Sequence, residues 1–254
     1  MATESLSREM VLDELKFLAT VEHALVVEAL SVRCSLGHDL DAEEGGATSD
    51  AARDAASAAS NLALSAMFRL KDINRLLIKA NEDATLERAT SITSQTAGAI
   101  ALGPPDLAQL QQLLTRGHHI ATAVDRRYER LRPAVTTDPV FDGDLLFNAH
   151  TLIVDDGPTH AASFAQLRDA LGALTPAEFL RATRREAADR FELRLLEVSD
   201  RGYRLVLAAL RGLFVPEDSV CGALRNLAVD AMEVLDHANR VLVSRGLLPP
   251  FTIR

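Results

Sequence analysis

The clearest structural pattern in the chain lies in residues 5–36, which read SLSREMVLDELKFLATVEHALVVEALSVRCSL. Apolar residues recur there alternately four and three positions apart, so they lie on one face of a helix. The row consists of Val11, Leu15, Leu18, Glu22, Leu25, Ala29 and Val32. The segment therefore predicts a long helix whose apolar face carries one carboxylate, that of Glu22.

A second charge interrupts an apolar row in the alanine-rich segment that begins near Ser49 or Asp50. This row consists of Leu62, Ala66, Arg69, Ile73, Leu76 and Ala80. A buried charge is strongly unfavourable unless it is paired. We therefore expect Glu22 and Arg69 to point inward and to need partners, the alternative for Glu22 being an edge position that reaches water.

The rest of the chain also shows helical periodicity, and no segment shows the sustained alternation that is typical of strands. Helices are predicted over about 106–131, 144–171, 176–213 and 216–245, with a weaker helical piece over 86–100. Prolines mark three boundaries: Pro133 ends a helix, Gly157-Pro158 breaks one, and Thr175 and Pro176 begin one as N-cap and first helical residue. The predicted inner rows are Leu110, Leu113, Gly117, Ile120, Val124, Tyr128 and Leu131 in the third long helix and Val220, Leu224, Leu227, Ala231, Val234, Ala238 and Val241 in the last.

Composition supports one all-α domain over residues 1–254. Alanine, leucine and valine dominate, whereas glycine (13) and proline (9) are sparse. The net charge of −9 disfavours nucleic acid as a partner, because phosphate contacts need a concentrated basic surface. No apolar run approaches the roughly 20 residues that span a bilayer. The polar N-terminus does not resemble a signal peptide, and Cys34 and Cys221 form no disulfide or metal motif, so we expect a cytoplasmic protein.

Five stretches occur in the order known from one enzyme family. They are TVEHAL (20–25), RLLIKA (75–80), LIVDDG (152–157), HAASF (160–164) and LPPF (248–251). Together they resemble the ferritin-like domain of iminophenylpyruvate dimer synthases, which act in bacterial violacein and rebeccamycin-type pathways. The resemblance implies a ferritin-like four-helix bundle with additional C-terminal helices.

A ferritin-like two-metal site takes carboxylates and histidines from four helices. The resemblance places Glu22, His119 (or His118), Asp155 (or Asp156) and His160 at ligand positions. Ala66 and Arg69 occupy the remaining pair, and neither residue can bind a metal ion. The resemblance therefore implies no bound metal, Fe or Mn being the alternative, with the Arg69 guanidinium lying against Glu22 and Asp155 or Asp156.

Three functions follow from this altered site. The first is a metal-independent enzyme that cyclises, dimerises or isomerises a small biosynthetic intermediate, with Glu22, Arg69, His119, Asp155 and His160 as catalytic residues. The others are a non-catalytic binding or assembly protein and an atypical metal oxidase. Plainer interpretations place the His118–His119 pair partly in solvent and make His160 a hydrogen-bonded core residue. Apolar rows on more than one helix face suggest a homodimer.

Overall fold

The computed structural model describes residues 6–36, 49–105, 107–138, 140–141, 160–175, 178, 185–214, 218–249 and 251. In these ranges the chain is mostly helical, which confirms the all-α prediction at this level. The helices are α1 (Arg8–Cys34), α2 (Asp50–Lys79), α3 (Leu107–Thr137), α4 (His160–Gly172), α5 (Arg190–Gly212) and α6 (Asp218–Ser244), and a hairpin of β1 (Ser91–Ser94) and β2 (Gly98–Ala101) joins α2 to α3.

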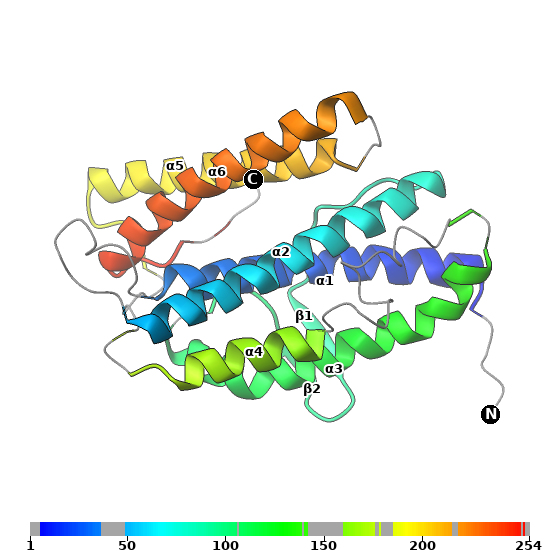
Figure 1. Cartoon of the computed structure of the whole chain (residues 1–254), viewed down its shortest axis with the longest axis horizontal. Helices are drawn as coiled ribbons and strands as arrows, with labels where there is room; N and C mark the ends of the chain where they lie inside the picture. Colours follow the sequence, from blue (N-terminus) through cyan, green and yellow to red (C-terminus); the bar gives the residue numbers. More distant parts are fainter. Residues whose placement is uncertain are drawn as a thin grey trace.

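Four of the helices close around a common centre. Helix α1 contacts α2 and α3, and α4 contacts the same two helices from the other side. Helices α5 and α6 pair with each other and cover the α1–α2 side, as Figure 1 shows with α5 in yellow and α6 in orange to red. Helix α1 has neighbours on both sides, and most of its residues from Leu18 onward are buried.

The structure confirms the predicted faces of the first three long helices. Each residue of the α1 row, including Glu22, is buried, and so is each residue of the α2 row, including Arg69. The predicted inner row of α3 is also buried. Ser7 and Ser49 cap α1 and α2 with hydroxyls that accept hydrogen bonds from Met10 N (3.3 Å) and Ala52 N (3.1 Å).

The predicted helical piece over 86–100 is wrong, because this region forms the β1–β2 hairpin. Ile92 and Ile100 are paired across the two antiparallel strands, and both are buried against the helices. The turn uses Gly98 at a φ of 67°, a conformation that glycine adopts readily. Two β-branched residues on one face of a short ladder therefore outweigh the weak helical pattern.

Two predicted helix boundaries are also wrong. Helix α3 continues through Pro133 to Thr137, since Leu131 and Val135 anchor its last turns in the core. Helix α5 begins at Arg190, after an N-cap at Asp189 that accepts a hydrogen bond from Glu192 N at 2.8 Å. Residues 185–188 are not helical, and most of the segment from Pro176 lies outside the described residues, as does the predicted helix before His160.

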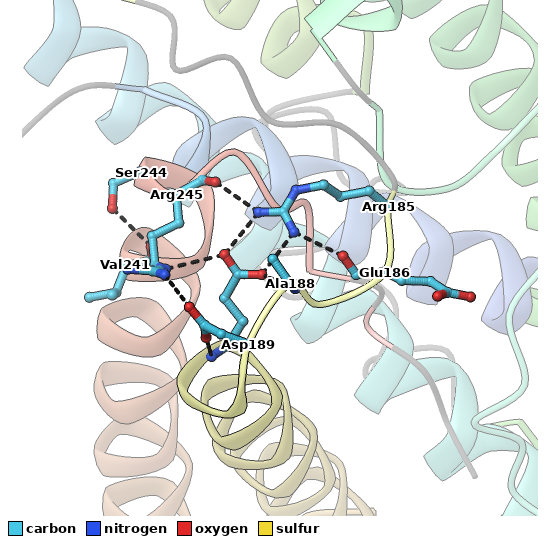
Figure 2. A network of polar contacts seen from close by, with 8 residues as sticks. Arg185, Glu186, Ala188, Asp189, Val241, Ser244 and Arg245 are labelled. Carbon is cyan, nitrogen blue, oxygen red and sulfur yellow. Dashed lines mark hydrogen bonds and ion pairs between the residues drawn. The ribbon is translucent and has the colours of Figure 1, made fainter.

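Two arginines hold the start of α5 to the end of α6 (Figure 2). Arg185 makes two hydrogen bonds to the carboxylate of Glu192, at 2.8 and 2.9 Å. Arg245 contacts the same carboxylate at 3.2 Å and Asp189 at 2.6 Å. The hydrogen bonds from Arg185 and from Ala188 N, which outweigh burial, lower the pKa of Glu192 to about 2, so it is ionised at neutral pH.

The predicted inner row of α6 is only partly correct. Ala231 and Ala238 are buried, whereas Val220, Leu227 and Val234 are 45%, 39% and 52% exposed. Helix α5 approaches α6 closely at Gly202, where an added Cβ would lie 3.4 Å from Leu235 Cβ. The α5 contact therefore runs beside the predicted row. Within the described ranges, no helix combines the length and apolar character needed to cross a membrane.

Candidate functional site

Glu22 lies at the centre of the four packed helices and is completely buried. Its Oε1 accepts a hydrogen bond from Tyr128 OH of α3 at 2.8 Å and lies 2.9 Å from His160 Nε2 of α4. Its Oε2 is 3.8 Å from Arg69 Nη1 of α2. One carboxylate on α1 therefore contacts a side chain from each of the other three helices.

His160 is the first residue of α4, and a single carboxylate fixes both the helix start and the imidazole. Asp125 Oδ1 accepts a hydrogen bond from His160 N at 3.2 Å and lies 2.9 Å from His160 Nδ1. Asp125 Oδ2 accepts from Ala161 N at 3.1 Å. A carboxylate at a helix N-terminus satisfies otherwise unpaired amides and matches the positive end of the helix dipole.

Both ring nitrogens of His160 therefore face carboxylate oxygens. A neutral imidazole has one N–H and can donate to only one of them, whereas an imidazolium donates to both. Burial alone raises the pKa of Glu22, but His160, Arg69 and the Tyr128 hydroxyl together lower it below its ordinary value. The same holds for Asp125: burial raises its pKa, but hydrogen bonds from His160 and Ala161 outweigh burial and lower the pKa below its ordinary value. Both carboxylates are therefore favoured in their ionised forms.

The phenol of Tyr128 serves as a permanent donor. Burial, and after it the charge of Glu22, raises the pKa of Tyr128 well above its ordinary value. The ring also lies 5.8 Å from the His160 ring in a stacked arrangement. Tyr128 therefore stays protonated and fixes the orientation of both Glu22 and His160.

The cluster runs from the core to the surface. The Asp125 side chain is 20% exposed, whereas those of His160 and Glu22 are fully buried. Among the described residues, Glu22 Oε2 receives no hydrogen bond although it is buried. Buried acceptors without a hydrogen bond are rare in folded proteins and call for an explanation, such as an ordered water or a functional role. The cluster thus has one end at solvent and one open acceptor in the core.

The structure brings three of the predicted site residues together and places another elsewhere. Glu22, Arg69 and His160 meet as the sequence predicts. His119 does not join them, since it is partly exposed and its Nδ1 lies 3.1 Å from Thr96 Oγ1 beside the hairpin. His119 precedes Tyr128 by nine residues, so the two side chains point to opposite sides of α3. Asp155 and Asp156 lie outside the described residues.

Sequence reasoning missed Asp125 and gave Tyr128 only a packing role. Tyr128 stands on the predicted inner row of α3, and Asp125 precedes it by three residues, a spacing that puts both side chains on neighbouring positions of one face. The pair Asp-x-x-Tyr was therefore a usable signal. That Asp125 caps α4 depends on the approach of two helices and has no local signature.

These residues do not fit a ferritin-like metal pair. Ala66, at one ligand position, is buried and has no donor atom, and the Arg69 guanidinium faces Glu22 where a cation would need the carboxylate. Over the part of the chain that the structure describes, no three His, Cys, Asp or Glu side chains are placed to hold a metal ion.

A cavity of about 700 Å³ lies away from this cluster, between α6, the C-terminal end of α1 and the middle of α2. Leu30, Ala63 and Met232 line it, and Arg33 pairs there with Asp236 at 3.0 Å. Leu30 follows Glu22 by eight residues, about 12 Å along the helix axis. This cavity and the buried polar cluster are therefore separate features.

Comparison with known proteins leaves the chain without a match: no protein-family model, no curated protein and no solved structure corresponds to it. The functional argument therefore depends on the geometry of the site.

Proposed function

We propose that this chain is a metal-independent enzyme that moves protons on a small organic intermediate, within a ferritin-like bundle that serves bacterial specialised metabolism. The pathway and the ferritin-like class come from the sequence resemblance. The observation that carries the catalytic proposal is the Asp125–His160–Glu22 chain, in which 2.9 Å contacts connect a partly exposed carboxylate to a buried one.

Each residue has a distinct role in this proposal. Glu22 Oε2 takes a proton from a C–H or O–H group of the substrate, and Arg69 holds a carbonyl or anionic group of the same molecule. A half-turn of the protonated Glu22 carboxyl then brings its O–H to His160 Nε2. With the imidazole in its neutral form, Nε2 takes this proton as Nδ1 releases its own to Asp125, which returns it to solvent. The reverse sequence protonates the substrate elsewhere, which is the net change of an isomerisation and assists cyclisation or dimerisation.

A second candidate is a non-catalytic binding or assembly protein in which the cluster is a structural ion-pair network. The burial of Glu22, Arg69 and His160, each 1% exposed or less, favours this alternative, because a closed network needs no ligand. A metal oxidase using Fe or Mn is less well supported, since Arg69 opposes a cation beside Glu22.

Proton exchange in D₂O distinguishes these functions. The protein is incubated with a panel of small 2-oxo acids and with a bacterial metabolite extract, and mass spectrometry follows deuterium incorporation. We expect the wild type to label one compound class and Glu22→Gln to reduce the labelling rate at least 100-fold. Glu28→Gln is the matched control, because Glu28 is a buried carboxylate of α1 outside the cluster and its loss should leave labelling unchanged.

Stability measurements complete the test. If no compound is labelled by the wild type while Glu22→Gln and His160→Gln each lose folding stability, the network is structural and the catalytic proposal is wrong. Metal analysis of the purified protein tests the third possibility: near-stoichiometric Fe or Mn would overturn a metal-independent mechanism.

A further inference from the structure

The paired helices α5 and α6 carry two exposed apolar rows on one side. Phe191, Val198 and Leu205 recur every seven residues on α5, and Val220, Leu227 and Val234 do so on α6. All six side chains are between 39% and 54% exposed. A seven-residue repeat of this length keeps side chains in line along a helix and is the spacing by which helices pack together.

Both rows face away from the four-helix centre. Val198 precedes Tyr203 by five residues, which is about 140° around α5, and Tyr203 is buried against α1 through a hydrogen bond with His23. Val234 precedes Asn239 by the same interval on α6, and Asn239 is buried on the side that faces α1 and α2. A groove of about 490 Å³ separates the rows; its lining is mostly apolar and also includes Glu233 and His237.

We propose that this α5–α6 face binds the same face of a second copy of the chain. The dimer is related by a two-fold axis parallel to the helices, so that α5 of one copy lies on α6 of the other. Four helices then enclose the two pairs of apolar rows. The inference is independent of the enzymatic proposal, because it uses none of the Glu22 cluster.

Charge along the edges of the face supports a second copy as the occupant. Arg201 is exposed beside the apolar row of α5, and Asp230 and Glu233 are exposed beside that of α6. Gly202 lies against Ala231 and Leu235 within one copy, so Arg201 stands at the height of the two acids. The two-fold axis preserves this height and brings Arg201 of each copy opposite Asp230 and Glu233 of the other.

The size of the face also suits a stable dimer. Helix α6 has 27 residues and is therefore about 40 Å long, and two packed helices make a strip about 20 Å wide. The strip offers about 800 Å², which is close to what each partner buries in a typical specific interface. Without a partner, the two apolar rows would form an unusually large exposed patch for a monomer.

Sedimentation velocity on the whole chain tests the proposal. We expect a species of twice the 27.5 kDa chain mass. Leu227→Glu combined with Val234→Glu should raise the dimer dissociation constant at least 100-fold while circular dichroism retains the helical signal. The matched control is Leu193→Glu, which alters an equally exposed leucine about 140° around α5 from Val198 and should leave the dimer intact.

Charge reversal tests the orientation of the two copies. Arg201→Glu should weaken the dimer about tenfold, and adding Asp230→Arg should restore most of the lost affinity. A wild type that stays monomeric at about 100 µM would overturn the proposal. So would a dimer that survives Leu227→Glu with Val234→Glu, or one that Leu193→Glu disrupts equally.

Discussion

Replacing Arg69 with methionine should strongly destabilise the protein, because it removes a cation that balances the buried Glu22. At the observed 3.8 Å separation, two unit charges interact by about 4 kcal/mol at an effective dielectric constant of about 20. Breaking a buried ion pair by removing one partner typically costs about 3–5 kcal/mol. We therefore expect Arg69→Met to lower the free energy of unfolding by about 3–4 kcal/mol at pH 7.

Urea unfolding followed by circular dichroism measures this loss, and a double-mutant cycle isolates the pair. Glu22→Gln with Arg69→Met should recover about 2 kcal/mol relative to the sum of the single changes. Arg53→Met on the same helix is the control, because Arg53 pairs with Asp50 in solvent and such pairs contribute about 0.5 kcal/mol or less. A loss below about 1 kcal/mol for Arg69→Met, or a coupling near zero, would refute charge compensation as the reason for the buried arginine.

Three further changes test other parts of the structure. Burial raises the pKa of Glu28 to about 7, so between pH 4.5 and 7 the folded protein keeps a proton that the unfolded chain has released. The free energy of unfolding therefore falls as pH rises through that range. Glu28→Gln should remove this decline in urea midpoints measured across the range, which is a gain of about 3 kcal/mol at pH 8. Tyr128→Phe should cost about 1.5–3 kcal/mol in the same urea assay, because it removes a hydrogen bond to a buried carboxylate, and an unchanged midpoint would contradict that role. The pKa of Glu192 is lowered to about 2, so its contribution to folding stability is complete above pH 4.5 and is lost as pH falls from about 4.5 toward 2. Glu192→Gln should therefore reduce the fall in melting temperature between pH 4.5 and 2. An unchanged fall would argue against the Arg185–Glu192–Arg245 contacts.

The sequence predicted the helical class and the faces of the central helices because those depend on local periodicity. Glu22 and Arg69 stood out as charges within apolar rows, and their meeting in the core follows from both rows pointing to one centre. The prediction of buried faces was less accurate where one apolar pattern fits two environments. The row on α6 is apolar for seven positions, yet nothing within it tells whether a side chain such as Leu227 contacts the neighbouring helix or solvent.

The remaining errors depend on contacts between distant segments. The hairpin at 91–101 is stabilised because Ile92 and Ile100 are buried against the helices. Such a contact between distant segments cannot be read from local propensity. His119 was placed by alignment to a pattern, and the geometry of α3 turns it toward Thr96. Asp125 was missed because its two tasks, capping α4 and orienting His160, appear only when α3 and α4 lie side by side.

The double use of Asp125 joins the assembly of α4 to the assembly of the buried cluster. The Asp125 side chain cannot move away from the imidazole without also releasing the amides of His160 and Ala161. Slow amide hydrogen exchange at Ala161 would therefore report on the integrity of the Glu22 environment from a surface position. A substitution at position 125 removes both the cap of α4 and the partner of the imidazole. The aspartate is therefore needed for the fold as well as for any chemistry it performs.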